Sequence, residues 1–280
     1  MKMKELPQSE RPYEKLELFG QESLSNAELL AIIIKTGTKE KSVIDIAKEI
    51  LNLGIDKNTN SLTMATNIPD LKDYNFCEII SNQVNKKVFL ENDANAAGLA
   101  EAIYGAGKDY DIVYYLTHST GIGGALIINK KIISGRKGFA GEVANVIVKN
   151  DGVKYNHLAI GAIENEASGT AITRIARELI DPNIKGASVV FKLYQEKHPI
   201  AIKIIEQMSK DFAILLSNIS AIIAPDCFVI GGGVSKNSDL YFDKVKKYYQ
   251  EYVHESNKDT PILKAKLEEP GLIGASLLSE

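Results

Sequence analysis

The stretch VFLENDANAA, residues 88–97, decides how the rest of the chain is interpreted. Its apolar residues Val88–Leu90 predict a short buried strand. An alanine-rich helix is expected to follow, from Ala94 to about Tyr104. Asp93 would then stand at the carboxyl end of a strand, where ligands bind in open α/β sheets. A second interpretation is that Asp93 serves only as a helix N-cap, accepting hydrogen bonds from the first free backbone amides.

The composition is that of a globular protein from a reducing compartment. Of the 280 residues, 45% are hydrophobic and 25% are charged, and the net charge is -3. The two cysteines, Cys77 and Cys227, lie far apart in apolar settings, so we expect buried thiols and a cytoplasmic location. No apolar run approaches the ~20 residues that span a bilayer, and no signal-peptide pattern is present, so we expect no membrane association.

The first 54 residues predict a small all-α module. Ser25 and Glu28 form a capping box before an apolar helix, and a later helix is expected to end at Gly54. The stretch resembles the N-terminal helical region of the RadC family over about residues 1–52, through LP (6–7), ERP (10–12), EKL (14–16), SLS (23–25), AELLA (27–31) and KTGT (35–38). That resemblance would imply DNA contacts. Residues 1–54 hold eight basic and nine acidic residues, so we expect no strong nucleic-acid binding.

Two glycine-rich turns follow predicted strands further along the chain. A strand at 111–117 runs into STGIGG, residues 119–124, with a return strand expected at 125–128. A second strand at 228–230 runs into GGG, residues 231–233, with a helix expected from about Ser238. Bare glycines let a phosphate approach backbone amides closely, although each run can also be only a tight turn. Together with Asp93, the turns form a set of one candidate base and two nucleotide-facing loops.

Six short motifs after residue 55 together resemble the ROK family of sugar kinases and sugar-responsive repressors. In family order they are ENDANAA (91–97), STGIGG (119–124), GE (141–142), Glu164 with ASGTA (167–171), IGGG (230–233) and GLIGA (271–275). The resemblance implies an α/β fold of the actin-like or ribonuclease-H-like ATPase type. It implies three domains: the helical module at 1–54, a remnant of the N-terminal lobe at 55–108, and the C-terminal lobe at 109–280.

The resemblance also implies roles for individual residues. Asp93 would be the general base that takes a proton from a sugar hydroxyl. The implied sugar-binding residues are Asn67, Asn92, Glu142, Asn145 and Glu164. The implied nucleotide-binding residues are Thr120, Gly121, Gly123, Gly231 and Gly232. The expected reaction is phosphoryl transfer from ATP with Mg²⁺ to a hexose or N-acylhexosamine, N-acetylmannosamine being favoured, and a homodimer is an expected assembly.

Two departures from the family pattern limit these expectations. Many ROK proteins hold a structural zinc with one histidine and three cysteines. The matching positions here are Asn145, Tyr155, His157 and Ala162, and we predict no zinc because one imidazole cannot complete a tetrahedral N/S site. The Asp-x-Gly-Gly-Thr loop, with which family kinases grip phosphate, is absent, and the helical module stands in its place.

The second departure predicts an incomplete N-terminal lobe and impaired catalysis. It also leaves two other functions open. One is a non-catalytic sugar-binding or regulatory protein. The other is a RadC-like, DNA-associated fusion product.

Overall fold

The computed structural model describes residues 53–56, 61–65, 77–78, 81–82 and 85–278. Contacts divide the chain after Asn92, and the unit that begins at Asp93 contains both glycine-rich turns. The divisions predicted after residues 54 and 108 stay predictions. Most of the proposed helical module and Asn67 lie outside the described residues. Among the residues that the structure describes, no helix is long and apolar enough to cross a bilayer.

Two short strands are described before residue 66. Strands β1 (Leu53–Asp56) and β2 (Ser61–Ala65) pair antiparallel, with a register shift between Gly54 and Ile55. Gly54 therefore lies within a strand, and the expectation that it ends a helix is wrong. A glycine at a register irregularity is consistent with its conformational freedom in a bulged strand.

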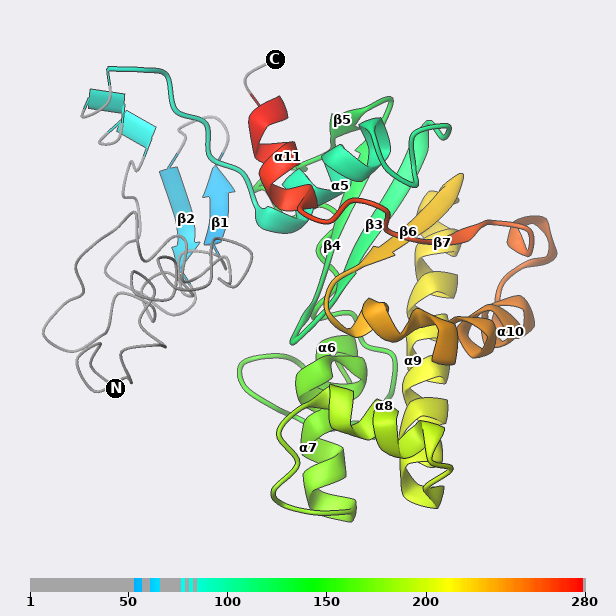
Figure 1. Cartoon of the computed structure of the whole chain (residues 1–280). Coiled ribbons are helices and arrows are strands. Elements are labelled where there is room, and N and C mark those ends of the chain that lie inside the picture. Colours follow the sequence, from blue (N-terminus) through cyan, green and yellow to red (C-terminus); the bar gives the residue numbers. More distant parts are fainter. Residues whose placement is uncertain (1–52, 57–60, 66–76, 79–80, 83–84, 279–280) are drawn as a thin grey trace, which may run out of the picture. The chain divides into compact units, whose positions relative to one another are not determined.

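A five-stranded mixed sheet forms the centre of the larger unit (Figure 1). Its order is β5-β4-β3-β6-β7. Strands β3 and β6 are parallel, as are β6 and β7, whereas β4 is antiparallel to both of its neighbours. The strands are β3 (Ile112–His118), β4 (Ile122–Ile128), β5 (Lys131–Ile132), β6 (Cys227–Gly231) and β7 (Ile262–Lys264).

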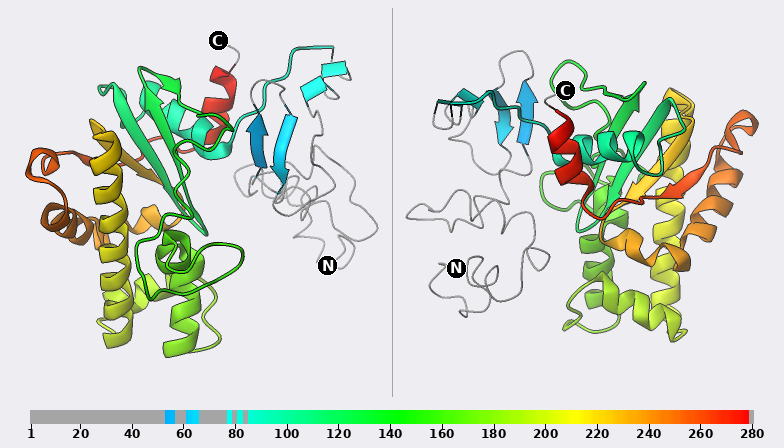
Figure 2. Two further views of the ribbon diagram at one scale, coloured as in Figure 1. Left: turned by 180° about the vertical axis from the view of Figure 1, so that it is seen from behind. Right: turned by 45° about the horizontal axis from the view of Figure 1, so that its top comes forward.

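Alternate residues of β3 enter two different hydrophobic clusters. Tyr114 and Leu116 join the larger cluster, whereas Val113 and Tyr115 join the smaller one. Both faces of the sheet are buried, and its central strands are therefore nearly continuous runs of apolar residues. On the smaller cluster's side, α5 (Asp93–Ile103) packs on the sheet and α11 (Pro270–Leu277) packs on α5 (Figure 2).

The larger cluster is completed by a group of helices. They are α6 (Ile163–Ala167), α7 (Gly169–Leu179), α8 (Ala187–Gln195), α9 (Pro199–Ile223) and α10 (Phe242–Tyr252). Of these, α6, α7 and α8 lie beyond the end of the sheet where β3 and β4 meet (Figure 1). Two 3₁₀ segments, η5 (Val234–Leu240) and η6 (Glu255–Asn257), flank α10. The apolar side of α9 is buried in the core.

The predicted alanine-rich helix is confirmed as α5, and its small residues explain how closely it packs. A Cβ atom on Gly98 would lie 3.0 Å from the Cβ atoms of both Ala125 and Tyr115. On the opposite side, a Cβ atom on Gly274 of α11 would lie 1.8 Å from the Ala96 carbonyl oxygen. Glycine and alanine thus let α5 approach both the sheet and α11, which fixes its first residue, Asp93.

The strand predicted at Val88–Leu90 is wrong. These residues form no ladder with any described strand, and Phe89 is 41% exposed. Its ring instead lies under the Lys87 ammonium, 4.6 Å from the ring centroid. Three apolar residues cannot make a strand by themselves, because their backbone groups need a partner strand.

Candidate active site

The first glycine-rich turn is shorter than the sequence predicted. β3 ends at His118, the chain reverses over 119–121, and β4 begins at Ile122, so Gly123 and Gly124 lie in a strand. A Cβ atom on Gly124 would lie 2.4 Å from the Gly141 carbonyl oxygen. This glycine therefore allows the segment that carries Glu142 to cross the start of β4.

The second glycine-rich turn has a left-handed backbone. β6 ends at Gly231, and Gly232 has a φ angle of +92°. A Cβ atom on Gly232 would lie 2.6 Å from the His118 carbonyl oxygen, so the position favours glycine by conformation and by space. The helix expected from about Ser238 begins earlier, as the 3₁₀ segment η5 at Val234.

The structure brings the two turns together. Thr117 of β3 pairs with Gly231 of β6 in the parallel ladder, so both turns follow the carboxyl ends of adjacent strands. A Cβ atom on Gly233 would lie 3.5 Å from Ser119 Oγ, which makes the turns immediate neighbours. Thr120 and Gly233 are exposed. Their backbone amides stand where the carboxyl edge of an α/β sheet receives ligands.

Asp93 lies at the start of α5, the helix that packs against β4. It is exposed, and its Oδ1 accepts a hydrogen bond from the Ala94 amide at 2.9 Å. The Ala94 Cβ atom lies 3.7 Å from the Cβ position of Gly123, which places the start of α5 against β4. Asp93 thus stands at a helix N-terminus, where its carboxylate accepts from a backbone amide, and it is exposed to solvent.

The surroundings of Asp93 make its carboxylate more basic than usual. Desolvation by neighbouring protein atoms raises the pKa of Asp93 above its ordinary value, and hydrogen bonds from backbone amides, including that of Ala94, oppose the rise. A raised pKa increases the ability of a carboxylate to accept a proton at neutral pH.

Glu142 is held beside the first turn by Gly141. The Tyr114 hydroxyl donates to the Gly141 carbonyl oxygen at 2.9 Å. Gly141 has a φ angle of +90°, and a Cβ atom there would lie 2.7 Å from the Leu126 amide nitrogen. The Glu142 Oε2 atom then lies 3.8 Å from the Cβ position of Gly123. Burial, followed by the charge of Glu142, raises the pKa of Tyr114.

Glu164 approaches the same turn from α6. Its Oε2 accepts a hydrogen bond from the Ile122 amide at 2.9 Å. A Cβ atom on Gly121 would lie 2.5 Å from that oxygen, so glycine makes room for the carboxylate. Two carboxylates, from Glu142 and Glu164, therefore flank the turn that carries Thr120.

The three asparagines predicted to bind the sugar differ in what the structure describes of them. The Asn145 Oδ1 atom accepts a hydrogen bond from the Ala159 amide at 2.7 Å, which leaves its NH₂ group as the part able to serve a ligand. Asn92 immediately precedes α5 and is half-buried. Asn67 lies outside the described residues.

The residues at the zinc positions of the family do not fit that metal. Asn145 uses its amide oxygen to hold the Ala159 backbone, and His157 is the only nitrogen ligand of the usual type among the four matching positions. No cluster of three or more His, Cys, Asp or Glu that could hold a metal occurs among the residues that the structure describes. The absence of zinc remains a prediction.

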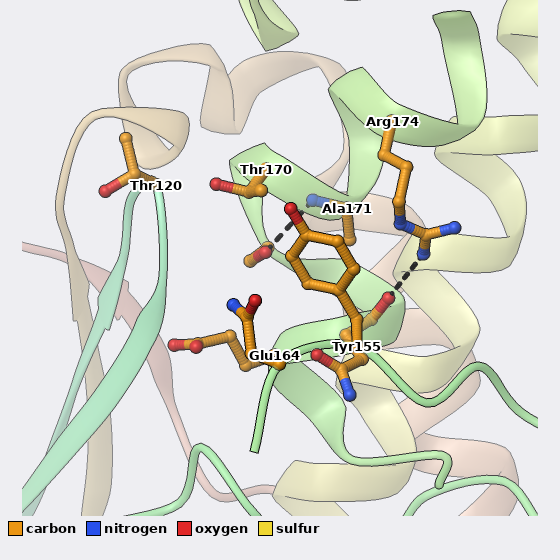
Figure 3. A pocket seen from close by; sticks show the side chains of 9 residues that line it. Thr120, Tyr155, Glu164, Thr170, Ala171 and Arg174 are labelled. Atoms are coloured by element: carbon orange, nitrogen blue, oxygen red, sulfur yellow. Dashed lines mark hydrogen bonds between the residues drawn. The ribbon is translucent and has the colours of Figure 1, made fainter. Parts of the chain in front are cut away.

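Sequence reasoning missed a polar pocket beside Glu164 (Figure 3). It is lined by Thr120, Tyr155, Asn156, Glu164, Asn165, Ser168, Thr170, Ala171 and Arg174. Arg174 donates to the Asn165 carbonyl oxygen at 2.9 Å, and its guanidinium carbon lies 5.8 Å from the centroid of the Tyr155 ring. Arg174 follows Thr170 by four residues, a spacing that places both on one helix face and could have signalled the pocket.

Comparison with known proteins agrees with this arrangement. A family model described as the ROK family matches residues 27–280, a range that overlaps the stretch assigned above to a RadC-like module. Glucokinase from Thermotoga maritima is 30% identical over 237 residues, covering 79% of this chain and 75% of the relative.

Two solved structures have the same fold. A ROK hexokinase from Thermus thermophilus superposes with a TM-score of 0.72 at 30% identity, covering 80% of this chain and 74% of that chain. A ROK family glucokinase from Streptomyces griseus, in complex with glucose and AMPPNP, gives a TM-score of 0.69 at 28% identity. That match covers 80% of this chain and 78% of the other.

Proposed function

The chain belongs to the ROK family, and we propose that it is an ATP-dependent kinase of a hexose or an N-acylhexosamine. The observation that carries the proposal is that two glycine-rich turns meet, with Glu142 and Glu164 beside the first turn and with α5, which Asp93 begins, packed against β4. The similar Streptomyces griseus protein, whose structure contains glucose and AMPPNP, supports a site for a sugar and a nucleotide.

In the proposed reaction, Asp93 accepts the proton of the sugar hydroxyl. The hydroxyl oxygen forms a bond to the γ-phosphorus of ATP while the bond from that phosphorus to the β–γ bridging oxygen breaks. The products are a sugar phosphate, ADP and a proton held on Asp93. A positioned general base contributes about 100- to 10,000-fold to such a rate, and the raised pKa of Asp93 suits the task.

Glu142 and Glu164 are proposed to orient the sugar. Each carboxylate accepts hydrogen bonds from sugar hydroxyls, and such charge-assisted bonds are stronger than neutral ones. Asn92, Asn67 and the NH₂ group of Asn145 are proposed to add further bonds. On the family resemblance described above, we propose N-acetylmannosamine as the preferred substrate.

The two turns are proposed to bind the nucleotide. The Thr120 hydroxyl and the amides of Gly121 and Gly123 would donate hydrogen bonds to phosphate oxygens. The backbone of Gly231 and Gly232 would lie against the adenosine. Thr120 and Gly233 are the exposed residues of the two turns, and their backbone amides can be reached by a ligand. Mg²⁺ would enter with ATP and neutralise part of the phosphate charge. Since the sequence has no Asp-x-Gly-Gly-Thr loop, we propose a turnover below the typical ~10 per second.

Release of ADP in the presence of N-acetylmannosamine, N-acetylglucosamine, glucose and mannose tests the proposal. We expect sugar-dependent release, with the highest kcat/KM for N-acetylmannosamine. Calorimetric titration of ATP-Mg and of each sugar accompanies the assay. Binding of a sugar without turnover would favour the non-catalytic regulatory protein, and the absence of both binding and turnover would refute a sugar site altogether.

A further inference from the structure

His118 is a fully buried histidine at the end of β3, directly before the first turn. Its side chain is 0% exposed and stacks on Phe212, with ring centroids 4.8 Å apart. The Nε2 atom lies 2.9 Å from the Ala167 carbonyl oxygen, and Nδ1 lies 3.0 Å from the Tyr241 hydroxyl. A carbonyl oxygen can only accept, so Nε2 carries the proton and Nδ1 accepts from Tyr241.

The two hydrogen bonds of His118 lead to two different elements next to the candidate active site. Ala167 is the last residue of α6, the helix that carries Glu164. Tyr241 ends the η5 segment, which begins directly after the second glycine-rich turn. The backbone of His118 itself lies against Gly232. One buried histidine therefore joins the end of β3 to the glutamate helix and to the segment that follows the second turn.

We propose that His118 is a positioning residue of the kinase site. Through Nε2 it fixes α6, and with it Glu164, on the sugar side. Through Nδ1 it fixes η5, and with it the turn at 231–233, on the nucleotide side. This inference rests on the proposed function, because it assigns each hydrogen bond to one of the two substrates.

The core around His118 gives a reason to prefer this role over simple space filling. Burying an imidazole costs free energy unless both nitrogens are bonded, whereas an apolar side chain would fill the same space without that cost. Burial lowers the pKa of His118 to about 4, against the raising effect of the Ala167 hydrogen bond, so the ring stays neutral near pH 7. What the neutral imidazole adds is two directional bonds, which an aliphatic side chain cannot supply.

Two substitutions separate the two bonds. The amide nitrogen of glutamine reaches the position of Nε2, so His118→Gln retains the donor to Ala167 and loses the acceptor for Tyr241. The amide oxygen of asparagine reaches the position of Nδ1, so His118→Asn does the opposite. We expect H118Q to raise the KM for ATP about 3- to 10-fold, the size of one hydrogen bond, with the sugar KM within about twofold. We expect H118N to raise the sugar KM by a similar factor and to spare the KM for ATP.

Two further variants keep the test decisive. Tyr241→Phe removes only a hydroxyl and should reproduce the H118Q pattern, even where a change at His118 prevents folding. Tyr249→Phe is the control, because the Tyr249 hydroxyl is equally buried and bonds to Ser220 Oγ at 2.8 Å and to the Asn257 carbonyl oxygen at 2.9 Å. Y249F should lower the thermal midpoint and leave both KM values unchanged.

The outcomes distinguish this inference from the proposed function. If the wild-type chain turns over but H118Q and H118N shift both KM values alike, or neither, the positioning role is refuted while the kinase stands. If the wild-type chain neither turns over nor binds a substrate, the proposed function fails. Amide hydrogen exchange without ligand then still tests the positioning: H118N should speed exchange at 168–170, H118Q at 233–241. Equal exchange in both variants would overturn it.

Discussion

The turns at 119–121 and 231–233 end neighbouring parallel strands, yet they need glycine for different reasons. At Gly121, a Cβ atom would meet the Glu164 Oε2 atom at 2.5 Å, so glycine there makes room for an acidic side chain. At Gly232, the backbone has a φ angle of +92° and a Cβ atom would meet the His118 carbonyl oxygen at 2.6 Å. Glycine in the first turn is required by the neighbouring Glu164 carboxylate, whereas glycine in the second turn is required by the backbone conformation.

This difference indicates how the two turns should respond to mutation. Changes around the first turn should alter recognition and chemistry while the fold survives, because the residues that surround it include exposed or half-buried carboxylates. Changes in the second turn should alter the fold first, because its conformation suits few residues other than glycine. The predictions that follow test this contrast, from the largest expected effect to the smallest.

Asp93→Asn tests the chemistry at the first turn. We expect kcat to fall about 100- to 10,000-fold, the usual contribution of a general base, with both KM values within a few-fold of wild type. Asp243→Asn is the matched control, since Asp243 is also an exposed acid in the first turn of a helix, α10. An equal loss of activity in D243N would show that Asp93 acts through helix stability alone.

The pair Gly232→Ala and Gly233→Ala tests the second turn. Alanine at 232 should lower the thermal midpoint by roughly 5 to 10 °C, because of the left-handed backbone and the close His118 carbonyl. Gly233 has a φ angle of -64° and open space on its exposed side, so G233A should fold normally. We expect G233A instead to raise the KM for ATP. Equal thermal midpoints for the two variants would remove the contrast between the turns.

Glu164→Gln tests whether the acid beside the first turn recognises the sugar. Glutamine retains an oxygen that can accept from the Ile122 amide, so the turn should keep its shape. Loss of the charge should raise the sugar KM roughly 10-fold, the size of one charge-assisted hydrogen bond, with an unchanged thermal midpoint. Glu178→Gln, a change at an exposed position of α7, provides the control. An unchanged sugar KM in E164Q would restrict Glu164 to holding the turn.

Asp211, a buried acid of α9, should make the free energy of unfolding depend on pH. Asp211 of α9 is buried, and its Oδ2 atom has no hydrogen-bond partner. Desolvation raises the pKa of Asp211 to about 6; Gln207, Lys149 and Lys210 oppose the rise and Glu166 adds to it. The folded state therefore holds this proton more tightly than the unfolded state, and stability should rise as pH falls.

Between pH 7 and 5, protonation of Asp211 should contribute about 1 kcal/mol to the free energy of unfolding. Urea unfolding at the two pH values measures this gain, and Asp211→Asn should abolish it. Persistence of the gain in D211N would assign the proton to another group.

Sequence reasoning found the parts of the site that local patterns encode. The alanine-rich run predicted α5, and the glycine runs predicted the positions of both turns, because small residues and strand ends leave local signals. It missed Glu101, which resembles a surface residue of a helix. In the structure Glu101 is 0% exposed and accepts hydrogen bonds from the amides of Ala106, Lys266 and Leu267. Contacts separated by more than 160 residues leave no periodic pattern.

His118 and Val88–Leu90 both show that a local sequence pattern cannot reveal contacts with distant residues. The partners of His118, Tyr241 and Ala167, are 123 and 49 residues away, so no local pattern marks this histidine. Val88–Leu90 looked like a strand because the pattern of three apolar residues is local, whereas the partner strand that it would need is not. Residues distant in the sequence therefore determine both the surroundings of His118 and the backbone structure of Val88–Leu90.

Hydrogen exchange with and without ligands tests the central claim most directly. The full chain would be saturated with a non-hydrolysable ATP analogue, Mg²⁺ and the best sugar of the panel, and exchange would be followed in peptides that cover 93–97, 119–124 and 231–236. Slower exchange in all three segments at once is the predicted result, since the start of α5 and both turns should border one site. Full occupancy with unchanged exchange in either turn would contradict the account.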